Sequence, residues 1–358
     1  MKIELSRRQL LGTTMAAGAL NLGGYIPRSN ATGPMNDLIN NSLTWDNHGC
    51  MPLRPNDFSF LDQLQRYKKS GFNIVALNVG FDAVPFELTF QMLAHFRHWL
   101  IEHDDDYLLI NGVKDIERAR SEDKLGVFFD IEGAAAIRDQ ISLIDFFYGL
   151  GVRWMSIAYN LNNRVGGGCQ DDDSGLTEFG KKVLDRMAKV GMVACCSHTG
   201  YRTTMDVMDH SENPVIFSHS NPLGLWQHER NIRDEAIDAC ASTGGVICLN
   251  GIGIFLGDND ASSEIFANHI DYVVQRVGPE SVGIGLDYVF DRQELDDFVK
   301  SHPETFPPEK GYDAGIEMVM PEQLSEIVGI LHNRGYSDDT LKMILGENLL
   351  RVAQVVWQ

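Results

Sequence analysis

Short apolar runs that end in a polar residue or glycine alternate with amphipathic stretches from about residue 42 onward. The runs are rich in β-branched and aromatic residues, which favours strands. The strands predicted are Ser42–His48, Asn73–Val79, Leu125–Glu132, Arg153–Tyr159, Met192–His198, Pro214–His219, Gly245–Asn250 and Ser281–Asp287. The helices predicted are Phe58–Ser70, Phe86–His103, Leu143–Leu150, Leu176–Val190, Thr203–His210, Asp234–Ser242 and Ser263–Val277, with more from Pro321 to Val356.

Strands that alternate with helices predict parallel pairing, and eight such units predict an α/β fold of the closed (β/α)8 (TIM) barrel type. An open doubly wound sheet is the alternative. The length of 358 residues suits one barrel, which we assign as a single domain to residues 32–358.

Residues 1–31 have the features of an export signal. Arg7 and Arg8 precede an apolar, Gly- and Ala-rich stretch from Leu10 to Gly24. This order predicts a twin-arginine signal peptide, cleaved after Ala31 and recognised by the twin-arginine export machinery, so we expect a periplasmic or secreted protein. The stretch is too short to span a bilayer, so no stable membrane span is expected in the mature chain. A chance arginine pair before a short apolar helix is the alternative.

The composition argues against nucleic acid as a partner and against a disulfide-rich scaffold. With 50 acidic and 30 basic residues, the formal net charge is −20. Nucleic acid is therefore not expected as a partner, because phosphate binding relies on clustered Lys and Arg. The cysteines are too sparse for a disulfide scaffold and are predicted to be free thiols unless one binds metal. They are Cys50, Cys169, Cys195, Cys196, Cys240 and Cys248.

Residue types that bind metals close several predicted strands, at the end of a barrel where active sites lie. They are His48, Glu132, His198, His219 and Asp287. Any one alone is more typical of a structural residue, but imidazoles and carboxylates converging from separate strands indicate zinc or a similar metal. Glu132 could bridge two ions, and Asp287 is the expected general base, with a ligand or helix-cap role as its alternative.

Other polar residues are assigned more ordinary roles. Arg230 follows the sixth predicted strand, where it could bind a substrate carboxylate or be solvated. Gly166–Gly168, followed by acidic residues, predicts a flexible loop. The remaining histidines are expected to be solvated or structural. They are His95, His98, His103, His210, His228, His269, His302 and His332.

Seven motifs from about Leu43 to Val356 occur in a distinctive order. They are DNHG at 46–49, DIEG at 130–133, CSHTG around His198, PVIFSHS at 214–220, ERN at 229–231, GIGLDY at 283–288 and GENLLRV at 346–352. In this order the chain resembles the membrane dipeptidase (renal dipeptidase) family, peptidase family M19 of the amidohydrolase-like superfamily.

The resemblance implies a barrel with two zinc ions. His48 and Glu132 would hold one ion, and Glu132, His198 and His219 the other. Arg230 would bind the terminal carboxylate of a small peptide substrate, and Asp287 would carry the proton. We therefore expect an exported zinc dipeptidase that hydrolyses dipeptides by a metal-bound hydroxide and tolerates a C-terminal D-residue. A homodimer is also implied.

Two positions depart from the family pattern. Cys50 stands where the family has an Asp ligand, so it either ligates zinc as a thiolate or is an inert thiol beside a weakened or absent first metal. Tyr159 stands where the family has a His that stabilises the oxyanion. A phenol donates one hydrogen bond but lacks the imidazolium charge, so Tyr159 or the adjacent Asn160 is expected to contact the substrate.

These departures leave two alternative functions. One is a metal-dependent hydrolase or tailoring enzyme that acts on an amide or lactam of a secreted peptide-like metabolite. The other is a non-catalytic binding protein that has lost a metal.

Overall fold

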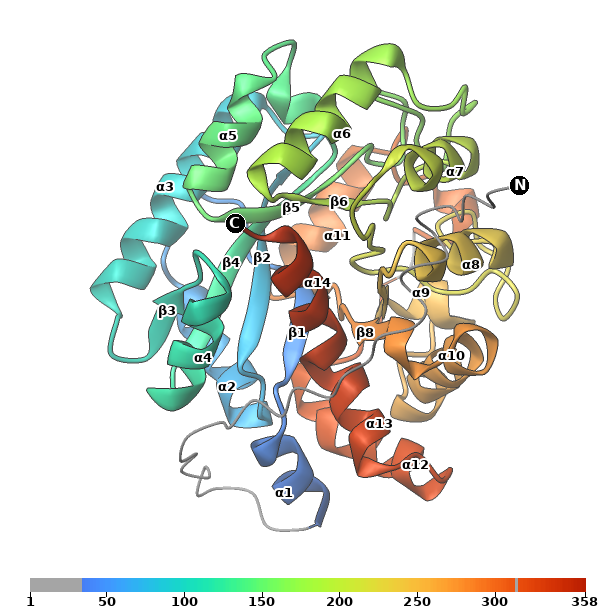
Figure 1. Cartoon of the computed structure of the whole chain (residues 1–358). Helices are drawn as coiled ribbons and strands as arrows, with labels where there is room; N and C mark the ends of the chain where they lie inside the picture. The colour runs from blue at the N-terminus through green and yellow to red at the C-terminus, as the bar shows by residue number, and fades with distance from the viewer. Residues whose placement is uncertain (1–33, 313–314) are drawn as a thin grey trace, which may run out of the picture.

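The computed structural model describes residues 34–312 and 315–358, so the predicted signal peptide lies outside the described residues. Its strands form one curled sheet, in which β6, β5, β4, β2, β1, β8 and β7 are neighbours in that order (Figure 1). All these pairs are parallel, as predicted, while β3 also pairs with β4 and β9 with β1. The strands are β1 (Trp45–Cys50), β2 (Ile74–Phe81), β3 (Tyr107–Leu109), β4 (Leu125–Glu132), β5 (Val152–Ser156), β6 (Val193–Cys195), β7 (Ile247–Leu249), β8 (Val282–Ile284) and β9 (Tyr288–Val289).

A short segment links the two ends of this curled sheet. The prediction of a full strand over Pro214–His219 is wrong, because only Ile216 and Phe217 form bridges there. Ile216 pairs with Cys195 of β6 and Phe217 with Ile247 of β7, both in parallel. The segment therefore takes the eighth position of a (β/α)8-type ring, and the eight predicted strands are the eight positions of that ring.

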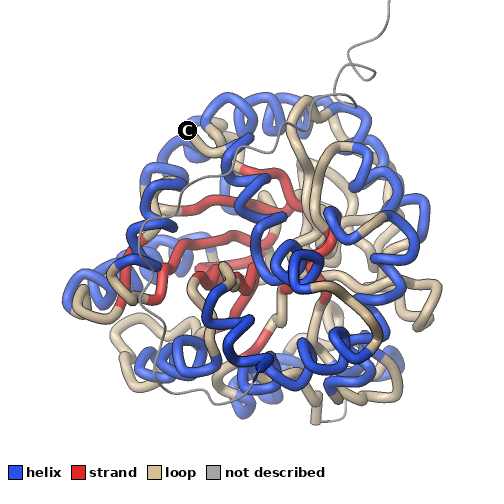
Figure 2. Tube along the Cα trace, turned by 60° about the horizontal axis from the view of Figure 1, so that its bottom comes forward, coloured by secondary structure: helices blue, strands red, loops and turns tan. Residues whose placement is uncertain are grey.

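Helices surround the sheet (Figures 1 and 2). They are α1 (Pro34–Asn41), α2 (Gln65–Ser70), α3 (Phe86–Glu102), α4 (Val113–Ser121), α5 (Ser142–Gly149), α6 (Glu178–Val190), α7 (Tyr201–His210), α8 (Asp234–Ser242), α9 (Gly253–Leu256), α10 (Ser263–Val277), α11 (Arg292–Ser301), α12 (Leu324–Asn333), α13 (Asp338–Lys342) and α14 (Asn348–Val356). All the predicted helices are present, although the first begins only at a 3-10 turn over Leu61–Leu64. The prediction missed α1, α4, α9 and α11. No helix among the described residues combines the length and hydropathy needed to cross a membrane.

The inward face of the ring changes from apolar to polar along each strand. On β4, Phe128 lies in an apolar cluster inside the ring, whereas the alternate residues Val127 and Phe129 belong to the cluster beneath the outer helices. Side chains of α14 join the inner cluster and cover that end of the ring. Further along the same inward face of β4 come Asp130 and Glu132, both buried. The ring therefore has an apolar interior at one end and a buried polar end at the other.

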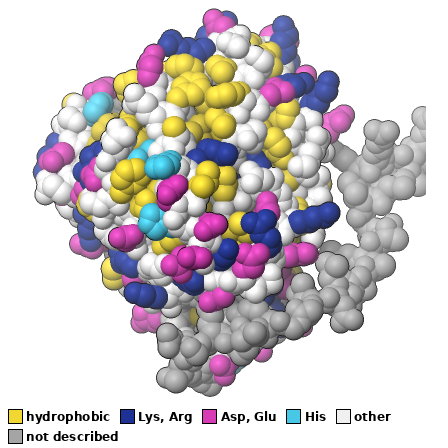
Figure 3. All heavy atoms as spheres, turned by 90° about the vertical axis from the view of Figure 1, so that its left-hand side faces the viewer, with side chains coloured by type: hydrophobic (Ala, Val, Ile, Leu, Met, Phe, Trp, Pro, Cys, Tyr) yellow, Lys and Arg dark blue, Asp and Glu magenta, His cyan; other side chains and the backbone are white. Residues whose placement is uncertain are grey.

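Charged side chains of both signs are interspersed on the outer surface (Figure 3). Many form exposed ion pairs, such as Arg118 of α4 with Glu122 just after that helix. Exposed pairs contribute little to the free energy of folding, so the ring depends on its two apolar clusters. All six cysteines are free thiols, as predicted.

Candidate metal centre

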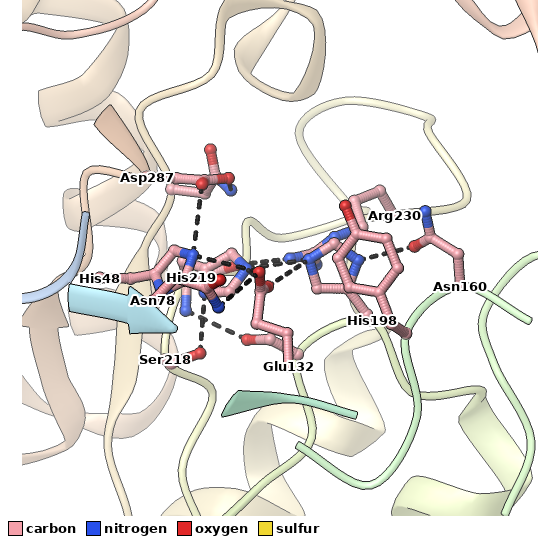
Figure 4. A network of polar contacts seen from close by, with 12 residues as sticks. His48, Asn78, Glu132, Asn160, His198, Ser218, His219, Arg230 and Asp287 are labelled. Carbon is pink, nitrogen blue, oxygen red and sulfur yellow. Dashed lines mark hydrogen bonds and ion pairs between the residues drawn. The ribbon is translucent and has the colours of Figure 1, made fainter. Parts of the chain in front are cut away.

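Four predicted ligands meet at the polar end of the ring (Figure 4). His48 lies on β1, Glu132 ends β4, His198 follows β6 and His219 follows the bridging segment. Glu132 Oε1 lies 3.0 Å from His198 Nε2 and 3.1 Å from His219 Nε2. The other carboxylate oxygen, Oε2, lies 3.5 Å from His48 Nε2. One oxygen of Glu132 therefore faces each side of the centre.

One carboxylate oxygen lies at the middle of this group without a hydrogen-bond donor. Glu132 Oε1 is buried and has no hydrogen-bond donor, although two imidazole nitrogens lie close to it. Those nitrogens, His198 Nε2 and His219 Nε2, are only 3.0 Å apart. The ligand atoms of His48, Glu132 and His219 all lie within 4.8 Å of one another. A buried group of imidazole and carboxylate donors of this kind suits a divalent transition metal.

Each of the three imidazoles is held by a protein group at its other nitrogen. The Nδ1 contacts are His48 with Asp130 Oδ2 at 3.2 Å, His198 with Asn160 Oδ1 at 2.6 Å, and His219 with Ser218 Oγ at 2.8 Å. Such contacts fix the tautomer and turn Nε2 toward the centre, as partners of metal-binding histidines usually do. Asn78 donates to Asp130 Oδ1 at 3.0 Å and to Glu132 Oε2 at 3.1 Å, which connects the partners with the ligand.

Cys50 and Asp287 complete the side of the centre next to His48. Cys50 Sγ lies 3.4 Å from His48 Nε2 and 3.4 Å from Asp287 Oδ1. Asp287 Oδ2 accepts a hydrogen bond of 2.8 Å from Asn250 Nδ2, so this carboxylate is held in place. The ligand atoms of His48, Cys50 and Asp287 also lie within 4.8 Å of one another. The thiol thus points into the centre, and its ligation of a metal stays a prediction.

Burial and neighbouring charges set the protonation of these groups. Burial, and after it the charge of Arg230, lower the pKa of His198 to about 3, so this imidazole is neutral, as a metal ligand must be. Burial raises the pKa of Glu132, but the charge of His48 and the contacts with the His198 and His219 imidazoles outweigh burial and bring that pKa well below its usual value. Burial also raises the pKa of the Cys50 thiol, so its thiolate needs a nearby cation.

Backbone turns beyond the strand ends aim several of these side chains. His198, Asn160 and Asp287 have φ values of 66°, 57° and 57°, a region that residues other than glycine rarely adopt. Gly168 packs so closely on the turn that a Cβ atom there would lie 2.1 Å from Asn160 O. Gly166–Gly168 is buried and supports the site, so the prediction of a flexible loop is wrong. Strained turns of this kind cluster at functional sites.

Tyr159 and Arg230 lie beside the centre. The Tyr159 ring stacks on His198, with ring centroids 4.1 Å apart. Arg230 is 2% exposed, so it is not a solvated loop residue. Its Nη1 donates to Ser220 Oγ at 3.1 Å and its Nη2 to His219 O at 2.9 Å, while Nε has no partner.

Four residues of this network were missed as site residues: Asn78, Asp130, Ser218 and Asn250. Each lies at or near the end of an apolar run. Each is also two residues away from another residue whose side chain faces the inside of the ring. Asp130 precedes Glu132 by two residues, and Asn78 follows Ala76 by two. The period of two along a strand, applied to polar residues, could have found both.

Comparisons with known proteins agree on a family and a fold. A model of the membrane dipeptidase family (peptidase family M19) matches residues 65–303, which begin after His48 and Cys50. A protein of Schizosaccharomyces pombe named as an uncharacterized dipeptidase is 29% identical over 211 residues, 56% of this chain. The match spans only 50% of that relative's length.

Two solved structures are also similar. An amidohydrolase from Pseudomonas aeruginosa is 26% identical with a TM-score of 0.82, covering 90% of this chain and 99% of that one. A metallo peptidase from Rhodobacter sphaeroides, liganded with a phosphinate mimic of the dipeptide L-Ala-D-Ala, is 17% identical with a TM-score of 0.72. That match covers 88% of this chain and 100% of the other, and at this identity it shows the fold alone.

The contact between His48 and Asp130 leads to a test. Asp130→Asn is expected to weaken metal binding about 10–100-fold, because it removes the carboxylate that orients the imidazole. Titration of the chelator-treated protein with Zn²⁺ measures the affinity. The matched control is Asp185→Asn, which removes a carboxylate 2.9 Å from His210 on the surface and should leave the affinity unchanged. Equal affinities in the two variants would contradict the role of Asp130.

Proposed function

Since the chain belongs to the membrane dipeptidase family, peptidase family M19, we propose that it is a metal-dependent dipeptidase. The position of Glu132 carries this proposal. Its Oε1 faces two imidazoles without a hydrogen-bond donor, and its Oε2 faces a third imidazole. A buried carboxylate so placed is suited to join two metal ions.

The proposed cofactor is a pair of zinc ions. His198 and His219 would hold one ion with Glu132 Oε1, and His48 would hold the other with Glu132 Oε2 and Cys50. Imidazole, thiolate and carboxylate are all ligands that zinc accepts. When bound, the metal supplies Lewis-acid polarisation of the peptide carbonyl and lowers the pKa of water.

The protein groups around the centre would position the dipeptide and move its protons. Arg230 would bind the substrate carboxylate through its Nε–H, which is buried without a protein partner, and Asn160 Nδ2, also unpartnered, would be a second donor. Tyr159 would donate to the carbonyl oxygen as negative charge develops there. Asp287, held through one oxygen by Asn250, would accept a proton during attack and return it to the leaving amine.

We propose that a C-terminal D-residue is tolerated. Support comes from the similar fold of the metallo peptidase that carries a phosphinate mimic of L-Ala-D-Ala. The same support makes L-Ala-D-Ala the first substrate to try.

Export by the twin-arginine route is a further part of the proposal. It rests on Arg7 and Arg8 ahead of the apolar stretch, which lie outside the described residues. This route carries folded proteins, so the metal would be acquired before export.

Metal content and activity on dipeptides test the function together. The purified protein is expected to hold two equivalents of zinc and to hydrolyse L-Ala-D-Ala. Chelation should abolish hydrolysis and added zinc should restore it. His219→Ala should lose metal and activity, whereas His210→Ala on the surface should keep both. One equivalent or none, with no turnover of any dipeptide, would favour the binding protein or a hydrolase of another amide or lactam.

The role of Cys50 is tested by the metal count. Cys50→Asp is expected to keep two zinc ions, because a carboxylate can replace a thiolate, and Cys50→Ala is expected to lose one. Zinc analysis of the dialysed variants measures this. Cys240→Ala is the control, because that thiol is buried against Val215 O in the core. An unchanged zinc count in Cys50→Ala would refute ligation.

Replacement of the arginine pair tests export. The double variant Arg7→Lys, Arg8→Lys should accumulate in the cytoplasm at full length, because the twin-arginine machinery reads that pair. Cell fractionation and the N-terminal sequence of the mature protein measure the outcome. As a control, Lys2→Arg keeps the pair and should be exported normally. Equal export of the double variant would exclude this route.

A further inference from the structure

A cavity of about 480 Å³ opens onto the candidate metal centre. Cys50, Glu132, His198 and Asp287 line one part of it, and most other lining side chains are apolar. Ligand sites of about 300–1,000 Å³ bury drug-sized molecules. A dipeptide of two alanines would place only two methyl groups in this cavity.

The residues of α11 that line the cavity are apolar except for Glu294. Leu295, Phe298 and Val299 lie on one side of the helix, because they are three and four residues apart, and the C-cap residue His302 continues that side. Leu295 and Phe298 are only half-buried, so they present apolar surface to the cavity. His302, expected to be solvated or structural, stacks on Phe298 with ring centroids 4.1 Å apart.

An aromatic surface runs from the centre into the cavity. Tyr159 stacks on His198, and the Phe81 ring lies 4.8 Å from the Tyr159 ring. Phe81 in turn packs edge to face with Phe298 at 5.5 Å, and Phe298 lies 5.8 Å from Phe306. These aromatic rings therefore form a continuous apolar surface that begins at the centre.

The charges around the cavity disfavour an acidic side chain. None of the described residues that line it is Lys or Arg. Asp291 and Glu294 lie among its lining residues, and Arg54 pairs with them at 2.9 and 2.8 Å. An anionic side chain would find no cation on these walls and would meet two more carboxylates.

We propose that the preferred substrate is a dipeptide with a large apolar side chain, which this cavity buries against α11 and Phe81. The inference rests on the proposed dipeptidase function and names its substrate class. Burial of a Phe side chain contributes about 1.5–3 kcal/mol, which corresponds to about 10–100-fold in specificity.

A substrate panel on the zinc-loaded full chain tests this. L-Phe-D-Ala or L-Ala-D-Phe is expected to have a kcat/KM about 10–100-fold above that of L-Ala-D-Ala. L-Asp-D-Ala is expected to fall below L-Ala-D-Ala. Hydrolysis of L-Ala-D-Ala as fast as both aromatic dipeptides would overturn this inference and leave the dipeptidase function standing. Hydrolysis of no dipeptide would overturn both.

A matched pair of variants tests whether α11 causes the preference for an apolar side chain. Leu295→Asp should lower kcat/KM for the aromatic dipeptide at least about tenfold and change that for L-Ala-D-Ala little, because the new charge lies in the apolar wall. Leu225→Asp makes the same change at a leucine that is 43% exposed and does not line the cavity. Thermal unfolding establishes that both variants fold. An equal loss on both substrates would overturn the assignment of α11, and if Leu295→Asp fails to fold, the panel on the unmodified protein decides.

Discussion

Burial of the Glu132 carboxylate among three imidazoles is the constraint on which the rest of the structure depends. Removal of a carboxylate from water costs several kcal/mol unless charge or hydrogen bonds compensate. Here one oxygen accepts from Asn78, and the other faces only imidazole nitrogens. A cation at the centre would compensate that oxygen, so metal binding would stabilise the folded ring.

Closure of the ring and assembly of the centre are the same structural event. His48 and His219 come from distant parts of the chain, yet their rings stack with centroids 4.0 Å apart. They meet because the bridging segment joins β6 to β7 and so places His219 opposite β1. In an open sheet, the segment that carries His219 would extend from one edge, away from the interior strand β1. The approach of His219 to His48 therefore depends on the short bridges at Ile216 and Phe217.

Sequence patterns predict the ring well because its strands are buried and punctuated by polar residues. His48, Glu132, His198, His219 and Asp287 were identified at strand ends, and the structure places all of them together. The partners of the imidazoles were missed, because an isolated Asn or Ser in a strand has no distinctive local pattern. Nor does sequence give the left-handed turns that aim three of these side chains, since tertiary packing imposes them.

The apolar cavity was harder to foresee for a related reason. Its main wall, α11, has the sequence RQELDDFVKS, in which charged residues outnumber apolar ones. The spacing of Leu295, Phe298 and Val299 is visible in the sequence, but only the fold shows that their face lines the cavity at the centre.

The resemblance implies departures from the family pattern at Cys50 and Tyr159, which both border this apolar cavity. Cys50, expected in place of a carboxylate, is a thiol whose pKa is raised by burial, and Tyr159, expected in place of an imidazole, is a phenol. The phenol of Tyr159 carries no charge at the border of the cavity, and buried charge without a partner is costly. Tyr159 also joins His198 to the aromatic surface that leads to Phe298. A metal centre bordered by apolar rings is suited to bind a substrate through its apolar side chain and to act on its polar backbone.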